Sequence, residues 1–350
     1  MKKLRVFQPV KTTNAPLCGS SVCSIKRIVP GFFMKSLGTV LLFLLMIPYL
    51  ITFLFGNLKE GGAETTPLSN LEEEAGEGDF YVTNKTVLGV ESIPLELYVA
   101  DRLARSIDDE FEMEALKAQA VLIRSGILFS EMEGGMQGNA RNISVEDGDY
   151  GSVQVTERIY EAVAETKGVY LTYENMPVNG SYFAVSNGST RNGEELCLTE
   201  YPYLKSVSCS RDFLSPDYAS SALYEENEFE RIWNQMLSFQ ITGKEILENE
   251  KITMEKSIDD MYIYRDSAGY VLYLEREGKY VSGEQFREVF SVSSASFHIL
   301  KEETKVIITA EGVGHGLGMS QFAANEMAKE GEDYIKILDY FFQGAAVKKL

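Results

Sequence analysis

A histidine framed by four glycines is the clearest candidate for chemistry in this sequence. The segment 312–321 reads GVGHGLGMSQ, with His315 at its centre and Ser320 and Gln321 at its end. Alternating glycines let backbone N–H groups approach a ligand or another chain segment closely. Their spacing does not match the dinucleotide-binding fingerprint, and no βαβ unit with a downstream acid follows. We therefore expect a rigid loop that presents polar side chains, with a histidine walled into the core as the alternative.

Two cations on one helix are the second candidate. Residues 111–129 give the strongest helical pattern of the chain, and Lys117 and Arg124 lie seven residues apart within it. Seven residues fall about 20° short of two full turns, so both side chains project from nearly the same line. The helix is apolar on most of its other sides, which favours cations that line a cleft. A solvated face with an ordinary pair between Glu114 and Lys117 is the alternative.

A hydroxyl-rich turn, SNGST at 186–190, follows an expected strand at 181–185. It lacks the G-x-S-x-G pattern of a nucleophile elbow, although a Ser/His/Asp triad that uses His315 stays open. The Asn-Gly pairs of this region fit glycosylation sequons, but we interpret them as turns. Cys197 and Cys209 could form a disulfide. With only two, distant histidines, the sequence predicts no bound metal and no cofactor.

Charge separates the chain into two parts. Asp and Glu outnumber Lys and Arg by 52 to 33, giving a net charge of −19, which excludes an electrostatically driven nucleic-acid binder. Every charged residue before Glu60 is nevertheless a cation. Between the two parts, residues 37–55 carry no charge and as a helix would reach about 28 Å, close to the hydrocarbon thickness of a bilayer.

This pattern predicts an uncleaved signal-anchor at 36–56, behind a basic cytoplasmic tail at 1–35. A buried core helix and a cleaved signal peptide are the alternatives, but the apolar run is longer than the usual 7–15 residues of a signal peptide. We expect a single-pass protein of the cell membrane, with its N-terminus in the cytoplasm and its C-terminal domain outside. Residues 57–78 are Gly-rich and acidic, which is typical of a solvated linker.

The remaining residues, 79–347, predict one large mixed exported domain of the α+β class, because helices and strands do not alternate with βαβ regularity. Expected helices lie at 94–107, 111–129, 229–239 and 334–342. Expected strands lie at 80–82, 87–90, 169–173, 181–185, 261–274 and 302–309.

Three segments of this domain resemble the stage II sporulation protein D family, whose fold is shared with amidase-enhancer proteins of bacterial cell walls. They are PLELYV with FEMEALKAQAVLIRS at 94–125, SYFAVSNGST with YPYLKSV at 181–207, and 283–297 with GHGLGMSQFAANEMAKEG at 314–331. Their order is that of the family, and they span nearly the whole exported part. The resemblance implies a membrane-anchored protein that acts on peptidoglycan, with founding members that are lytic transglycosylases active in sporulation.

The sequence differs from the family pattern at the position of the expected catalytic acid. The family's glutamate stands eight residues before the acid of EALKAQ, and counting back from Glu114 gives Ser106. Glycoside cleavage needs a carboxyl group that protonates the leaving oxygen, and a serine hydroxyl has no such pKa. Asp101, Asp108, Asp109 or Glu110 could substitute, with Asp108 the first to test, although acids here also favour a helix start. Whether the protein is an enzyme is therefore left open.

The resemblance also implies substrate contacts. Lys117 and Arg124 stand where the family's substrate-binding cations are expected and would pair with the muramic lactyl carboxylate. Tyr182 and Tyr203 offer rings for sugar faces, and the remaining predicted contacts are Ser186, His315, Ser320 and Gln321. The zinc ligands of some relatives have no counterpart here.

We expect a catalytically degenerate peptidoglycan binder, and the alternative is an active lytic transglycosylase with a substitute carboxylate. A purely structural role in a wall or engulfment complex is a third possibility. The expected partners are glycan strands, the cytoplasmic membrane, and a cell-wall amidase or engulfment-complex proteins, with no nucleic acid.

Overall fold

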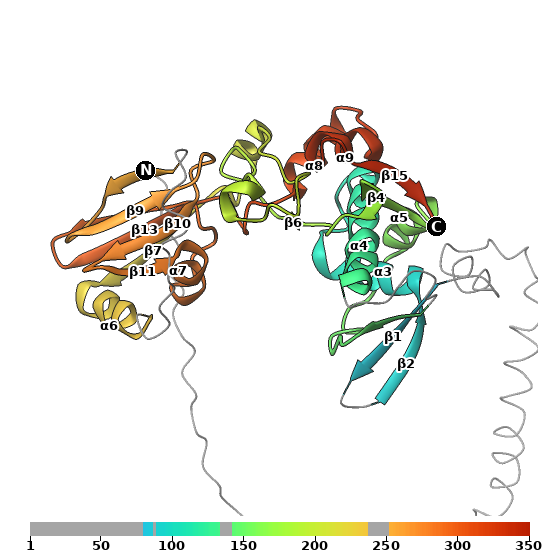
Figure 1. The fold of residues 1–350 in the computed structure, drawn as a ribbon, viewed down its shortest axis with the longest axis horizontal. Helices are drawn as coiled ribbons and strands as arrows, with labels where there is room; N and C mark the ends of the chain where they lie inside the picture. The colour runs from blue at the N-terminus through green and yellow to red at the C-terminus, as the bar shows by residue number, and fades with distance from the viewer. Residues whose placement is uncertain (1–79, 87–88, 134–141, 237–251) are drawn as a thin grey trace, which may run out of the picture. The chain divides into compact units, whose positions relative to one another are not determined.

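The computed structural model of the chain describes residues 80–86, 89–133, 142–236 and 252–350 (Figure 1). Contacts between Cα atoms divide the chain into residues 1–63 and 64–350, and every described residue belongs to the second unit. The predicted tail at 1–35, membrane segment at 36–56 and linker at 57–78 lie outside the described residues. Among the helices that are described, none combines the length and the apolar composition needed to cross a bilayer.

A central helix organises the first part of the described fold. This helix, α4 (Met113–Glu133), packs against α3 (Leu95–Ser106) and α5 (Glu157–Glu165), as Figure 1 shows. The apolar faces of the three helices share one core, in which Leu103, Leu116 and Ile159 are fully buried. A three-stranded sheet ordered β2-β1-β3 completes it, with β1 (Tyr81–Thr86), β2 (Gly89–Pro94) and β3 (Asn142–Val145).

The opposite side of α4 packs against the C-terminal end of the chain. Helices α8 (Gln321–Lys329) and α9 (Tyr334–Phe341) contact it there. So does a sheet ordered β15-β4-β5, made of β4 (Val169–Tyr173), β5 (Met176–Pro177) and β15 (Ala346–Lys349). Val121, Leu338 and Phe341 lie in the core that these elements share. Because α4 has packed neighbours on nearly every side, its sequence is apolar all round rather than on one stripe.

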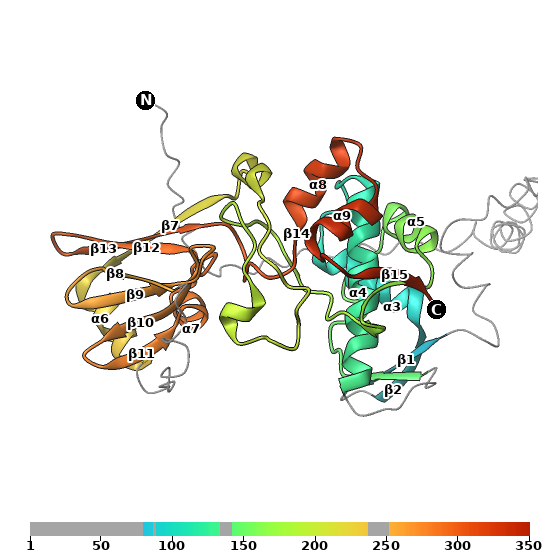
Figure 2. The same ribbon diagram turned by 45° about the horizontal axis from the view of Figure 1, so that its top comes forward.

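A separate core lies in the second half of the chain. One sheet is ordered β11-β10-β9-β8 and another β12-β13-β7, and helices α6 and α7 pack against them (Figure 2). Their bounds are β7 (Ala219–Glu225), α6 (Glu226–Met236), β8 (Thr253–Lys256), β9 (Met261–Arg265), β10 (Val271–Arg276), β11 (Lys279–Ser282), α7 (Gly283–Val289), β12 (Phe297–Glu302) and β13 (Lys305–Glu311). Stacked rings of Phe286, Phe290 and Phe297 fill this core, with centroids 4.3 and 4.6 Å apart.

The structure confirms the mixed α+β class and the long helix. Several expected strands differ in detail from what forms. Residues 302–309 cross the Glu303–Thr304 turn between β12 and β13. Residues 261–274 make the hairpin of β9 and β10 rather than one strand, because the Ser267–Gly269 turn interrupts the apolar run. Residues 181–185 form only the short β6 (Tyr182–Phe183), which pairs in parallel with β14 (Met319–Ser320).

Candidate functional site

Two of the predicted motifs lie side by side. The pairing of β6 with β14 puts Tyr182 beside Met319, and the backbones of Val185 and Val313 exchange two hydrogen bonds, at 3.1 and 2.7 Å. The N–H of Arg191 donates to the carbonyl of Gly316 at 2.8 Å. The glycine loop is thus held along its length by residues 182–191. The expected close approach of another chain segment is present, but Ser320 and Gln321 at the end of the loop are buried rather than presented to solvent.

The glycines permit this close approach. All four, at 312, 314, 316 and 318, have positive φ. At Gly318 φ is +79°, and a Cβ atom would lie 2.1 Å from the carbonyl oxygen of Ser181. A side chain at this position would therefore both strain the backbone and collide with the neighbouring segment.

Two predicted glycan contacts, Ser186 and Ser320, are fully buried around one carboxylate. Ser320 caps α8 and its hydroxyl donates to Asp212 at 2.8 Å, while the N–H of Ser186 donates to the same carboxylate at 2.7 Å. Burial raises the pKa of Asp212, and the hydrogen bonds to its charged form oppose that rise. The structure places this cluster in the interior, where it locks the two motifs together.

His315 lies half-buried against the ring of Phe183, with the two ring centroids 5.7 Å apart. Its Nδ1 accepts a hydrogen bond from the N–H of Leu317 at 3.1 Å, and the ring also bonds to the backbone of Tyr182. Burial, followed by the charges of Arg287 and Arg191, lowers the pKa of His315, so the imidazole is neutral at pH 7. The bonds of Asp212 go to serines and backbone rather than to His315, so Asp212 and His315 do not form a Ser/His/Asp triad.

A buried arginine that the sequence did not single out joins the glycine loop to the second core. Arg191 is 2% exposed, and its Nε donates to Asp266 at 2.6 Å and its Nη1 to Glu284 at 3.0 Å. Its guanidinium also lies 5.1 Å from the ring centroid of Tyr270. The sequence did not reveal this role. Arg191 directly follows a polar turn, and an exposed arginine is equally compatible with that position.

The two predicted cations of α4 have different surroundings. The ammonium group of Lys117 pairs with Glu114 at 2.6 Å and with Glu165 at 2.5 Å, and 14% of its side chain is exposed. Burial lowers the pKa of Lys117, but the hydrogen bonds that its ammonium group donates to these two carboxylates outweigh burial and raise the pKa above its ordinary value. It is a charged, partly accessible group at the edge of the helix.

Arg124, by contrast, is 0% exposed. Its guanidinium donates to both carboxylate oxygens of Glu96, at 3.1 and 2.5 Å, and to the carbonyl of Val169 at 2.7 Å. The structure therefore differs from the expectation that this side chain lines a cleft, because its donors are directed into the fold. Its role as a glycan ligand stays a prediction.

Ser106, where the family's acid is expected, ends α3 beside the third motif. Gln321 Nε2 donates to its backbone carbonyl at 2.7 Å, and Asn325 Oδ1 accepts from the N–H of Glu112 at 2.7 Å. Helix α8 thus holds both ends of the loop between α3 and α4. The Ser106 hydroxyl donates to the carbonyl of Leu103, and exposed Asp108 accepts from the N–H of Glu110 at 3.0 Å. The predicted residues 106 and 321 are therefore brought together.

A pocket of about 320 Å³ lies between α3, α4, β3 and the turn that leads into β6. Arg102, Asn179 and the predicted Tyr182 line it, above apolar side chains that include Ile123 and Ile127. The Arg102 side chain is 44% exposed and lies one helical turn before Ser106. It is an accessible cation that the sequence did not mark. Tyr203 lies elsewhere, 4% exposed, and its hydroxyl accepts from the N–H of Asn179 at 3.0 Å.

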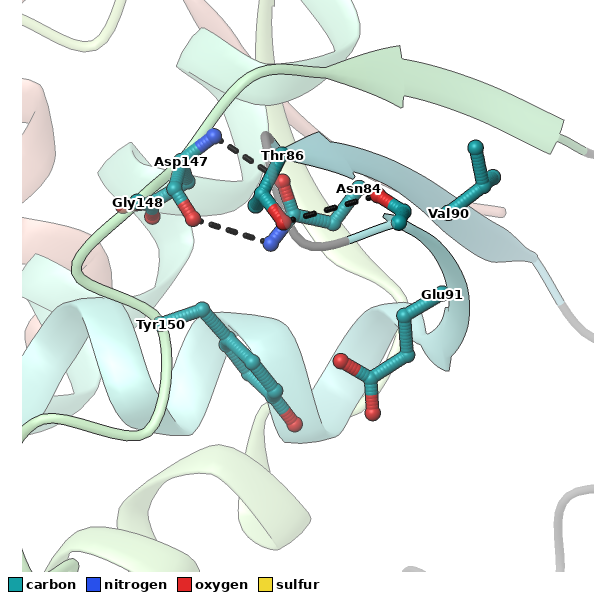
Figure 3. A pocket seen from close by; sticks show the side chains of 8 residues that line it. Asn84, Thr86, Val90, Glu91, Asp147, Gly148 and Tyr150 are labelled. Atoms are coloured by element: carbon teal, nitrogen blue, oxygen red, sulfur yellow. Dashed lines mark hydrogen bonds between the residues drawn. The ribbon is translucent and has the colours of Figure 1, made fainter.

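A second pocket, of about 330 Å³, opens beside the β1–β2 hairpin (Figure 3). Glu91 and Tyr150 extend into the same space in Figure 3, and burial and the charge of Glu91 raise the pKa of Tyr150 to about 12. Asp147 lies at its wall, with its backbone bonded to the Asn84 amide at 2.9 Å in both directions.

The Asp147 carboxylate accepts from Tyr98 at 2.9 Å and from Arg105 at 2.6 and 3.2 Å. These bonds outweigh the effect of burial and lower the pKa of Asp147 to about 2. Its oxygens are therefore already occupied by the protein.

The cysteines and the acidic side chains also bear on metal ligation and on a disulfide between Cys197 and Cys209. Within the described residues no group of three His, Cys, Asp or Glu side chains is placed to hold a metal ion. The thiols of Cys197, which is exposed, and Cys209, which is buried, are both free.

The fold and the site define a mixed α+β protein whose long helix and glycine loop meet at the end of α3. Residues 83–173 match the family model described as Stage II sporulation protein. The chain is 31% identical over 345 residues to Stage II sporulation protein D of Bacillus subtilis (strain 168), covering 91% of this chain and 96% of that protein. The protein of the same name from Bacillus amyloliquefaciens is 33% identical over 276 residues, 74% of this chain and 76% of that protein.

The chain therefore belongs to the stage II sporulation protein D family. It is also 23% identical over 275 residues to a protein named amidase enhancer from Bacillus subtilis (strain 168). That match covers 68% of this chain and 38% of the other protein.

Proposed function

We propose that the protein is a membrane-anchored, extracytoplasmic peptidoglycan-binding protein that acts in cell-wall remodelling during sporulation and has lost glycan cleavage. The observation that carries this proposal is the environment of Ser106. The frame that holds position 106, through Gln321 and Asn325, is intact, but the side chain at that position is a hydroxyl. Serine in place of glutamate at position 106 leaves glycan binding possible, but it removes the carboxyl group that would protonate the leaving oxygen.

The binding surface in this proposal is the pocket lined by Arg102, Asn179 and Tyr182. Its apolar floor and tyrosine ring suit the C–H face of a sugar, and its amide and guanidinium groups suit acetamido and carboxylate groups. In this proposal Arg102 replaces Arg124 as the glycan-binding cation, because 44% of the Arg102 side chain is exposed although its Nη1 lies 3.7 Å from Asp147, whereas Arg124 is fully buried.

Glycan binding is tested by sedimenting the full chain, in detergent, with glycan strands freed of stem peptides. Replacing Arg102 by alanine should weaken binding about tenfold, as expected for one charge-assisted hydrogen bond. Lys329→Ala is the matched control, because that side chain is 49% exposed and lies on α8, outside the pocket. Equal binding by both variants would contradict the assignment of this pocket.

The loss of cleavage is tested by restoring the acid. The wild-type chain should release no anhydromuropeptides from the same strands, Ser106→Glu should release them, and Ser106→Gln should not. Thermal unfolding of each variant checks that the larger side chain is accommodated at the half-buried position 106.

The alternative is an active lytic transglycosylase that uses Asp108, the exposed carboxylate two residues from Ser106. It predicts product release by the wild-type chain that Asp108→Asn abolishes. The name of the third relative suggests one partner, so we also propose that glycan-bound protein stimulates a cell-wall amidase.

A further inference from the structure

An aromatic pocket lies apart from the pocket proposed for glycan and includes Tyr203, the predicted sugar contact that does not line that first pocket. It has a volume of about 470 Å³ and is built by the end of α4, the β4–β5 turn and residues 199–203. Four rings follow one another along it. Phe129 and Tyr201 meet edge to face with centroids 5.7 Å apart, Tyr201 and Tyr203 are 6.1 Å apart, and Tyr203 and Tyr173 are 5.6 Å apart.

Proline and methionine extend the apolar surface of this aromatic pocket. Pro177 and Pro202 line it together with Met176, half of whose surface is exposed. Tyr203 is 4% exposed and forms the floor, whereas Phe129, Tyr173 and Tyr201 are only partly buried. Surfaces of this kind bind ligands that offer flat apolar faces, among them sugars and polyproline II segments.

Charge distinguishes these two ligands. Glu174 and Glu200 both line the pocket and are exposed, and among the described residues neither carboxylate takes part in an ion pair. The neighbouring cation, Lys348, donates instead to the side-chain oxygen of Asn175 at 2.8 Å. Peptidoglycan carries carboxylates of its own, so it would meet like charge here. A cationic ligand would find opposite charge and ring faces together.

The pocket is also held in place by the backbone. Glu174 and Asn175 have φ of 49° and 69°, the left-handed conformation that a two-residue turn between paired strands requires. The adjacent pair of Tyr173 and Met176 closes this hairpin. A ligand would therefore meet a preformed wall, which reduces the conformational entropy lost on binding.

We propose that the aromatic pocket binds a basic, proline-containing segment of a partner protein in an extended polyproline II conformation. The prolines pack on the rings, and a lysine or arginine side chain lies against the rings near Glu174 and Glu200. Such a segment has no internal hydrogen bonds and little conformational freedom to lose. This site is separate from the pocket proposed for glycan, so either assignment can fail without the other.

The test measures binding of fluorescein-labelled PPRPPKP to the full chain in detergent by fluorescence anisotropy. The variant Glu174→Gln/Glu200→Gln should bind about tenfold more weakly, from two exposed charge pairs. The control Glu161→Gln/Glu302→Gln makes the same change in net charge at exposed positions outside the pocket and should bind as the wild type does.

Three results would overturn the proposal. They are equal affinity of the two double variants, equal affinity of the wild type for the neutral peptide PPQPPQP, and displacement of the basic peptide by an N-acetylglucosamine tetramer. The last would assign the pocket to glycan. Far-UV circular dichroism of both variants confirms that the exposed substitutions leave the fold unchanged.

Discussion

Replacing Asp147 by asparagine removes one charge from the wall of the pocket in Figure 3 and nearly preserves the shape of the side chain. Asp147 is 9% exposed and accepts hydrogen bonds from Tyr98 and from two nitrogens of Arg105. Its backbone bonds to Asn84 do not depend on the charge. The substitution therefore tests the carboxylate alone, in the contact that ties the segment after β3 to α3, where Arg102 also lies 3.7 Å from Asp147.

The magnitude follows from the pKa. A fall from 3.8 to about 2 on folding corresponds to about 2 kcal/mol of stability at pH 7, at roughly 1.4 kcal/mol per pH unit. Because the pKa of Asp147 is depressed in the folded state, this contribution is complete above pH 3.8 and is lost as the pH falls through about 2. Roughly half of it should remain at pH 3.

Urea-induced unfolding of the full chain, followed by far-UV circular dichroism, measures this effect. The difference in free energy of unfolding between wild type and Asp147→Asn should be about 2 kcal/mol at pH 7 and about half of that at pH 3. A difference that stays constant across this range would show that the substitution acts through shape rather than charge. No difference at pH 7 would refute the pairing with Arg105.

Three further predictions concern single groups. Gly318→Ala should lower the free energy of unfolding by about 2–4 kcal/mol, whereas Gly331→Ala, at positive φ with open space around it, should cost only about 1 kcal/mol. Arg124→Met should cost about 3–5 kcal/mol because Glu96 is left buried without its cation, and the added change Glu96→Gln should recover part of the loss. NMR titration of His315 should give a pKa below 6.5, and a value at or above 6.5 would contradict its neutral, hydrogen-bonded state.

Sequence patterns predicted the structure where the conformation depends on residues that are near one another in the chain. The periodicity of 111–129 predicted α4, and the alternating glycines at 312–318 predicted a loop that another chain segment approaches closely, because each glycine conformation is a local property. The start of α4 is different. There the N–H of Glu112 bonds to Asn325, which lies far along the chain, so no rule for helix caps could identify its partner.

Contacts between residues far apart in the sequence also explain why the candidate site was predicted only in part. Spacing put Lys117 and Arg124 on one line of α4, but it could not tell a partly accessible cation from a fully buried one. Arg124 is buried because Glu96 comes from α3 to neutralise it, and that carboxylate is identified only by the packing of two helices. Arg102 had no partner pattern in the sequence, and its exposure follows from the position of α3.

Arg124 has a structural role, so its presence does not help to decide whether a protein with Ser106 cleaves glycan. A residue that holds Glu96 and Val169 is required for the fold, so its presence does not report on catalysis. The same holds for Ser186 and Ser320, whose bonds join the two motifs around Asp212. Much of the family pattern in this chain can thus persist without any chemistry. The residue at 106 is different, because its hydroxyl bonds only within α3, to the carbonyl of Leu103, so Ser106→Glu tests the proposed loss of cleavage without removing a contact between elements.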